Sequence, residues 1–295
     1  MYMKLKKLLA RIIKEDAVDD LKSAYEKQDL ATFSRELASV LDDPKVFAVL
    51  VSGTRDGSLA DDRFTITQTR LKCKNLIPTQ NEIGFNQSIE NLLTDQYGSL
   101  KSILTGTADM GPNPIVVYAG EFIIDGHHRW SQAYVGNPDS TILALNIEQK
   151  PGFSHIDVLK VVHAAVAKQL KAVPTNTALG TNILDGVSAD EIRTEVENKL
   201  TDNARNLWMQ YGGNIDSDED IVQRITDNIN LMAKKGAAAG APSRQYMPQT
   251  DADNLKTKDT LRQLKGIVNV QEPFVAESIR EKFTRIGRLR KYGNS

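Results

Sequence analysis

Cysteine is nearly absent from this chain of 295 residues, which contains a single cysteine at position 73. One cysteine can form neither an internal disulfide framework nor a zinc site built from several cysteines. A lone free cysteine is usually buried as a small apolar side chain, so we expect Cys73 to be buried; a nucleophilic thiol is the alternative. The scarcity of cysteine suits a reducing compartment, and we therefore expect a cytoplasmic protein.

Long apolar runs are absent as well. No stretch of about 18 apolar residues occurs, so no membrane span is predicted. The first residues, MYMKLKKLLARIIKEDAV, begin with lysines, but Arg11 and Lys14 interrupt the apolar positions, which is a poor fit to a signal peptide. A basic amphipathic helix can lie on a membrane surface, yet the acidic residues that follow within one turn favour a helix packed on a domain.

An excess of charge of either sign is also missing, because 37 basic and 38 acidic residues leave a formal net charge of −1. A chain coated with basic residues for nucleic acid is therefore excluded, whereas a local basic patch is not. The last residues hold such a patch, in which Arg285, Arg288, Arg290 and Lys291 are candidates for binding nucleic acid or an acidic protein partner. A solvated helical face explains the same pattern equally well.

The apolar pattern changes several times along the chain and divides it into four parts. Apolar residues at helical spacing dominate residues 1–60 and 151–235, which we expect to be helical. Residues 61–150 mix short β-branched strands with helices and are predicted to form a compact α+β core. The remaining residues, 236–295, begin with a stretch rich in alanine, glycine and proline, which predicts a linker before the basic tail.

Individual elements follow from the same patterns. Strands are expected over 63–73, 115–119, 121–124 and 140–148. Helices are expected within 88–104, from within 127–135, over 154–173, after residue 188 and over 218–235. Ser188 and Glu191 form a capping box at the start of one of these helices.

Two other groups of residues suggest ion binding only weakly. Acids at positions 216, 218 and 220 form part of a calcium-loop pattern, but isoleucine occupies the place of the required glycine, so a helix N-terminus is favoured. His155 and His163 lie eight residues apart on one predicted helix. We interpret each as a structural histidine, with an approach of one of them to the main site as the alternative.

The strongest candidate site is the stretch FIIDGHHRWSQAYV, which contains two of the four histidines of the chain. Gly126 permits a sharp turn after the apolar strand, and the helix that follows presents backbone amides and a positive dipole to an anion. Arg129 adds a planar guanidinium suited to phosphate oxygens, while His127 and His128 can donate hydrogen bonds. Asp125, at the end of the strand, can hold Mg²⁺ or act as a base.

A polyphosphate site fits this cluster better than a zinc site. Adjacent histidines diverge on either a strand or a helix, whereas chelating pairs usually lie three or four residues apart. The alternative without function is a turn that caps a helix, with Arg129 paired to a surface acid.

The stretch IVVYAGEFIIDGHHRWSQA resembles the box of ParB-like and sulfiredoxin-like domains, in which a pair of strands precedes a G-x-x-R turn that opens a helix. ParB partition proteins carry Gly-Glu-Arg-Arg-Trp there, and Gly126, Arg129 and Trp130 match it. Sulfiredoxins carry Gly-Cys-His-Arg, and Gly126, His128 and Arg129 match that. His127 stands in place of the reactive cysteine, which rules out sulfinic-acid reduction by the mechanism of that family.

The DGHxR box of the free-serine kinases with this fold is matched throughout, from Asp125 to Arg129. Upstream, LIPTQNEI is similar to the segment that these families place before their first helix. In the serine kinases a glutamate from this segment acts as the general base on the acceptor hydroxyl, and the resemblance gives that role to Glu82. An exposed loop acid is the alternative for Glu82. The resemblance covers about residues 63–150.

The resemblance implies a small mixed-sheet ParB/sulfiredoxin-like core with helical flanks that uses ATP, or another nucleoside phosphate, and Mg²⁺ for phosphoryl transfer or nucleotide hydrolysis. It implies phosphate binding by Gly126, His127, His128 and Arg129, a metal at Asp125, and catalysis by Glu82, Asp125 and His127. ParB-like domains with such flanks are common in phage genomes. The alternative is therefore a non-catalytic DNA-binding or nuclease-like accessory protein, either in the host cytoplasm or among the proteins of a virion.

Overall fold

The computed structural model describes the central part of the chain. The described residues are 63–111, 114–149, 154–156, 158, 159, 180–244, 247 and 269–274, with only the backbone for 63–66 and 269–274. The helical segment predicted over 1–60, most of the helix predicted over 154–173 and the tail residues Arg285, Arg288, Arg290 and Lys291 lie outside these residues. They stay predictions.

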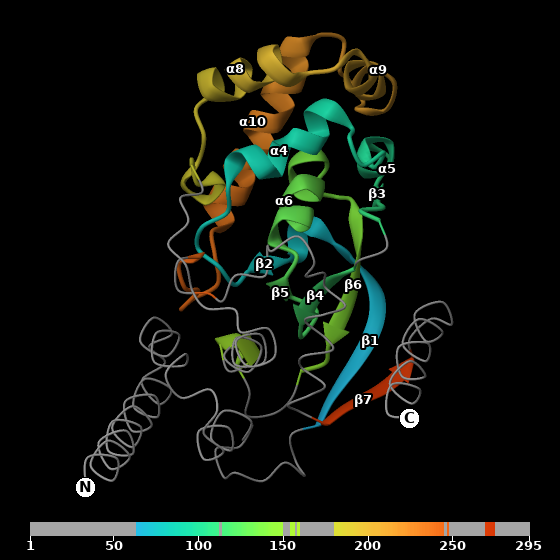
Figure 1. Cartoon of the computed structure of the whole chain (residues 1–295), viewed down its shortest axis with the longest axis vertical. Coiled ribbons are helices and arrows are strands. Elements are labelled where there is room, and N and C mark those ends of the chain that lie inside the picture. Colours follow the sequence, from blue (N-terminus) through green and yellow to red (C-terminus); the bar gives the residue numbers. More distant parts are fainter. Residues whose placement is uncertain are drawn as a thin grey trace, which may run out of the picture.

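A mixed sheet of seven strands lies below the helices in Figure 1. Its strands are β1 (Arg63–Lys72), β2 (Ile77–Pro78), β3 (Thr107–Ala108), β4 (Ile115–Tyr118), β5 (Phe122–Asp125), β6 (Thr141–Ile147) and β7 (Asn269–Phe274). The order is β2-β5-β4-β6-β1-β7, with β3 paired to β6 beside this path. The pairs β1–β6 and β4–β5 are antiparallel, and the other pairs are parallel. The predicted α+β class is confirmed.

The hairpin of β4 and β5 at the centre of the sheet was predicted from its two apolar runs. All four residues of β4 are buried, as expected for a strand covered on both faces. The turn between the strands uses positive φ angles at Ala119 and Gly120, which match the twist of the strands that it joins. Gly120 also donates its amide hydrogen to Asn146 Oδ1 on β6 at 2.7 Å. The hairpin is thereby fixed to its neighbour, and β5 ends beside the start of the next helix.

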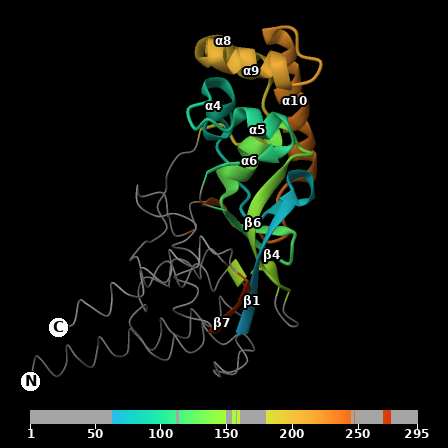
Figure 2. The same cartoon turned by 90° about the vertical axis from the view of Figure 1, so that its right-hand side faces the viewer.

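The described residues contain six α-helices: α4 (Phe85–Thr94), α5 (Leu100–Leu104), α6 (His127–Gly136), α8 (Ala189–Lys199), α9 (Asp202–Tyr211) and α10 (Asp218–Lys235). The short 3₁₀ helices are η1 (Cys73–Asn75) and η2 (Ile183–Asp185). Figure 2 shows α8 and α9 stacked beyond α4, α5 and α6, with α10 running alongside. None of the helices in the described part is both long and apolar enough to cross a membrane.

One hydrophobic core joins the predicted α+β core to the helical region after residue 150. Ile192 on α8, Trp208 on α9 and Ile225 on α10 belong to the same buried cluster as Ile89 on α4 and Trp130 on α6. The predicted boundary at residue 150 therefore does not separate two cores. The helices α8–α10 pack against the elements that carry the candidate site.

The helix α9 and its N-cap residue Thr201 provide hydrogen-bond donors for the end of α4. The last carbonyls of a helix have no partner within the helix. In α4 two of them find partners nearby: Leu92 O accepts from Trp208 Nε1 at 2.9 Å, and Leu93 O accepts from the Thr201 amide at 2.9 Å. A buried indole N–H and a buried carbonyl thus pair across the two parts of the chain.

The helix starts predicted at Ser188 and near Asp218 are confirmed. Ser188 Oγ accepts from the Glu191 amide at 3.2 Å, but the Glu191 carboxylate accepts from Thr181 Oγ1 instead of closing a capping box. At the start of α10, Asp220 Oδ2 accepts from the Asp216 amide and from Ser217 Oγ. These acids therefore serve a helix N-terminus, as the missing glycine predicted.

Residues 236–244, the start of the predicted linker, lie against the core, and we call them the C-terminal strap. The Ala238 amide donates to Pro78 O at 2.9 Å, and Pro242 O accepts from the Asn81 amide at 3.1 Å. Ala238 and Pro242 are both buried. Small residues let the strap lie close to β2, and composition alone does not reveal such backbone hydrogen bonds.

Cys73 is fully buried, as predicted. Burial raises the pKa of its thiol to about 12, although the hydroxyl of Ser140 at 3.4 Å acts in the opposite direction. At neutral pH the thiol is therefore protonated, and protonated thiols are poor nucleophiles. The nucleophile alternative is not supported.

Trp208→Phe tests the pairing of α9 with α4. The substitution leaves the Leu92 carbonyl buried without its donor, so we expect the free energy of unfolding to fall by roughly 1–3 kcal/mol. The exposed Met209→Ala on the same helix should change it by no more than about 0.5 kcal/mol. Denaturant unfolding measures both, and equal effects of the two substitutions would contradict this account.

Candidate functional site

The start of α6 lies directly behind the strand β5. Gly126 caps the helix with φ 92° and ψ 27°, in the left-handed region. A Cβ atom at this position would lie 2.6 Å from Ile115 Cγ2 and 2.9 Å from Arg129 Nη2. Both the backbone angle and the space therefore require glycine. No side chain caps the helix, so its positive end is presented to whatever lies in front of it.

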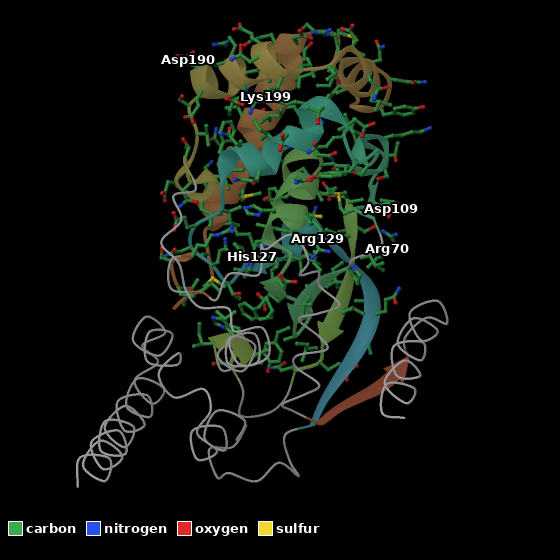
Figure 3. The ribbon with its side chains drawn as sticks, in the orientation of Figure 1. Arg70, Asp109, His127, Arg129, Asp190 and Lys199 are labelled. Carbon is green, nitrogen blue, oxygen red and sulfur yellow. The ribbon has the colours of Figure 1, made fainter. Side chains whose placement is uncertain are left out.

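Arg129 is held against this turn. Its Nη1 donates to Pro114 O at 3.1 Å, and its Nη2 lies 3.9 Å from Asp125 Oδ2. Burial lowers the pKa of the guanidinium, while the negative charge of Asp125 raises it. Figure 3 shows Arg129 and His127 where the sheet meets the helices. The acid beside Arg129 is thus the aspartate of the same motif, and the guanidinium stays next to the helix N-terminus.

His127 is buried and joins α6 to the chain after β2. Its Nε2 accepts a hydrogen bond from the Thr79 amide at 3.2 Å, which requires that Nε2 is unprotonated. This nitrogen is therefore engaged in holding the fold together. The geometry indicates a positioning role for His127, and its predicted catalytic and phosphate-binding roles stay predictions.

His128 is uncharged at neutral pH. Burial lowers its pKa to about 4, and the positive charge of Arg244 lowers it further. Its Nε2 is buried and has no hydrogen-bond partner within the described part of the chain. Desolvation favours the neutral ring, so His128 does not carry a positive charge at neutral pH. Its predicted role in phosphate binding stays a prediction. A neutral imidazole still offers one hydrogen bond.

Glu82 lies on a loop of residues 79–84, here called the Glu82 loop. On one side, Asn182 Oδ1 accepts from the Ile83 amide at 2.9 Å, and Asn182 Nδ2 donates to Asn81 O at 3.0 Å. On the other side, Pro242 of the strap accepts from the Asn81 amide. The loop is thus held between the segment before η2 and the C-terminal strap.

The Glu82 carboxylate itself is bonded to the strap. Glu82 Oε2 accepts from Ser243 Oγ at 2.8 Å, and this contact is partly buried. Burial lowers the pKa of the neighbouring Arg244, while the negative charge of Glu82 acts in the opposite direction. The alternative of an exposed loop acid is therefore excluded. Arg244 interacts electrostatically with both Glu82 and His128, so these three side chains share one region.

Ser243 and Arg244 are parts of the site that sequence reasoning missed. Both lie in a stretch that was predicted to be a linker because its residues are small, interrupted by glycine and proline, and low in large apolar side chains. One signal was present: Arg244 is the single charged residue of GAAAGAPSRQYMPQT. A buried partner for that charge follows only from the packing of the strap.

Asp125 is a candidate ligand for magnesium. Mg²⁺ is usually bound by one or two carboxylates together with substrate phosphates, so a single carboxylate at the strand end fits it. Among the described residues no group of three or more histidine, cysteine, aspartate or glutamate side chains is placed to hold a metal ion. Phosphate oxygens of a substrate would have to complete the coordination.

His155 has a structural role, as predicted. Its ring stacks on Phe122 of β5, with the ring centroids 4.3 Å apart, and its Nε2 lies 2.9 Å from Ala239 O in the strap. It thus connects β5 to the strap. His163 lies outside the described residues.

No protein-family model, no curated protein and no solved structure matches this chain. The resemblance to ParB-like and sulfiredoxin-like domains therefore stays a prediction that rests on the motif. The geometry of the site must be argued from its own residues.

Gly126→Ala and Gly180→Ala separate backbone strain from steric conflict. Both glycines have a positive φ, but a Cβ at Gly180 meets nothing within 4 Å. We expect Gly180→Ala to lower the free energy of unfolding by about 1 kcal/mol through the left-handed backbone. Gly126→Ala should lower the free energy of unfolding by roughly 1–3 kcal/mol more than Gly180→Ala does, because the added Cβ overlaps Ile115. Equal losses in denaturant unfolding would refute the close packing at Gly126.

The low pKa of His128 predicts a pH dependence of stability. The pKa rises from about 4 in the folded chain toward 6.5 on unfolding, so between these values the unfolded chain binds more protons. Stability is then lost as the pH falls from 6.5 toward 4. His128→Gln should remove about 2 kcal/mol of the difference in unfolding free energy between pH 7.5 and pH 5. An unchanged difference in that variant would show that His128 is not buried in its neutral form.

Proposed function

We propose that the start of α6 binds the phosphate groups of a nucleoside triphosphate and that the protein transfers or hydrolyses a phosphoryl group there. One observation carries this proposal: the loop that bears Glu82 is hydrogen-bonded to the first turn of α6, where the Thr79 amide donates to His127 Nε2 at 3.2 Å, and Arg244 interacts electrostatically with both Glu82 and His128. A carboxylate, a helix N-terminus and two arginines thereby occupy one region. Phosphoryl transfer depends mainly on positioning and on compensating the charge of the phosphates, and these groups can do both.

The binding half of the site consists of the α6 N-terminus and Arg129. The helix dipole and the amides of the first turn favour an anion. Arg129 contributes a guanidinium whose orientation is fixed by Pro114 O and Asp125. Asp125 would hold a magnesium ion, which would neutralise part of the phosphate charge. ATP with Mg²⁺ is accordingly the substrate and metal of this proposal.

The reactive half of the site consists of Glu82 and the residues that hold it. A carboxylate hydrogen-bonded to a hydroxyl is the arrangement in which kinases accept the proton of an attacking hydroxyl. Glu82 makes such a hydrogen bond with Ser243. Glu82 is therefore the general base of the proposed reaction, and His127 positions it through the Glu82 loop. A ParB/sulfiredoxin-like fold and a cytoplasmic place of action belong to the same proposal.

Isothermal titration calorimetry with MgATP tests the binding half. A charge-assisted hydrogen bond contributes about 1.5–3 kcal/mol, so Arg129→Gln should weaken MgATP binding by roughly 10- to 150-fold. Arg224→Gln on α10 removes the same charge away from this site and should leave the affinity unchanged. Thermal melting of each variant checks that it is folded. Equal affinities of Arg129→Gln and the unchanged protein, or no binding at all, would refute the proposal.

A further inference from the structure

Ser243 presents its hydroxyl to Glu82, the proposed general base. Its Oγ donates to Glu82 Oε2 at 2.8 Å in a partly buried contact. A serine hydroxyl bonded to a base is the usual arrangement of an activated oxygen nucleophile, because the base takes the proton as the oxygen attacks. The base is in turn held in place, since the loop that carries it is fastened by Asn182 and by Pro242. Nucleophile, base and support are thus all present.

Other hydroxyl–carboxylate pairs in the described part of the chain have a simpler explanation. Thr181 donates to Glu191 and Ser217 donates to Asp220, and both contacts are exposed. Each lies at or beside the first turn of a helix, where such bonds satisfy the helix end. Ser243 directly precedes a short 3₁₀ turn at Arg244, whose carbonyl accepts from the Met247 amide at 2.9 Å. Its bond differs from the other two because the acceptor, Glu82, lies on a loop and the contact is partly buried.

The pair also lies near the proposed phosphate site. Thr79, three residues before Glu82, donates its amide to His127 in the first turn of α6. The residue after Ser243 is Arg244, whose positive charge acts on His128 in the same turn. An extended chain advances by at most about 3.6 Å per residue, so these links confine the pair to the neighbourhood of the α6 N-terminus.

We propose that Ser243 is phosphorylated by its own chain. This inference rests on the proposed function, since it requires a nucleoside triphosphate at the start of α6. Ser243 Oγ attacks the terminal phosphorus, and a new O–P bond forms. The bond from this phosphorus to the bridging oxygen breaks, and the nucleoside diphosphate leaves with the electron pair. The hydroxyl proton passes to the Glu82 carboxylate, so the products are phosphoserine, the diphosphate and one proton.

Phosphorylation of Ser243 changes how the strap is held. A phosphoserine carries a charge of about −1.5 to −2 at neutral pH and has no hydroxyl proton to donate to Glu82. The two acidic groups then repel each other. The backbone bonds from Ala238 to Pro78 and from Asn81 to Pro242 can persist. The modification therefore releases the side-chain contact between strap and loop and exposes Glu82.

Mass spectrometry of the full chain incubated with MgATP tests the inference. We expect one added phosphoryl group, located at Ser243 by peptide fragmentation, and none in Ser243→Ala. Ser243→Thr keeps a hydroxyl and should be modified at that position. Glu82→Gln still accepts the hydrogen bond but is no base, so the rate should fall by about 10²- to 10⁴-fold. Glu197→Gln, an exposed acid on α8, is the matched control and should react at the original rate.

The possible outcomes distinguish this inference from the function on which it rests. If MgATP binds and nucleoside diphosphate forms while Ser243 stays unmodified, the inference is overturned and the proposed function stands. If calorimetry shows no MgATP binding, both are overturned. An unchanged rate in Glu82→Gln, or an initial rate per chain that rises with protein concentration, also overturns transfer to Ser243 within one chain. Melting temperatures of all variants verify that a lost reaction is not a lost fold.

Discussion

The buried backbone of the Glu82 loop is the constraint on which the site depends. Thr79, Gln80, Ile83 and Gly84 are all buried, although the loop has no regular structure beyond a single bridge. Buried amides and carbonyls must find hydrogen-bond partners, because an unpaired one costs roughly 1–3 kcal/mol. The partners come from three distant parts of the chain: the ring of His127, the side chain of Asn182 and the carbonyl of Pro242. Satisfying this loop therefore draws α6, the segment before η2 and the strap together.

The same arrangement determines the charges at the site. Packing the strap against the loop places Arg244 near Glu82 and His128, and burial lowers the pKa of both Arg244 and His128. A histidine that loses its hydration beside a positive charge becomes neutral. The site thus combines a base and cationic groups without relying on a charged histidine. The motif alone suggested that both histidines and Arg129 bind phosphate, whereas in the structure the cationic groups are Arg129 and Arg244 and His128 is neutral.

The regular elements were largely predictable from sequence because each follows a local pattern. Alternating β-branched residues indicated β1, and the helical period with its acidic first turn indicated α10 over Asp218–Lys235. The strands β2 and β3 were missed because two residues are too short to show a period. In the site, Gly126 and Arg129 were predictable because a strand-to-helix turn for an anion needs those residue types. The roles of Ser243 and Arg244 were not predictable. Their partner, Glu82, is distant in the sequence and lies 161 residues before Ser243.

By itself, the sequence determined the α+β class, the turn at Gly126 and the set of residues that open α6, because these depend on neighbours within a few positions. Only the tertiary structure decided which of those residues can act. In the folded chain His127 accepts a hydrogen bond from a backbone amide, burial keeps His128 neutral, and Glu82 accepts a hydrogen bond from Ser243. The physical reason is that protonation and pairing depend on burial and on charges distant in the chain. Residue types alone do not reveal either.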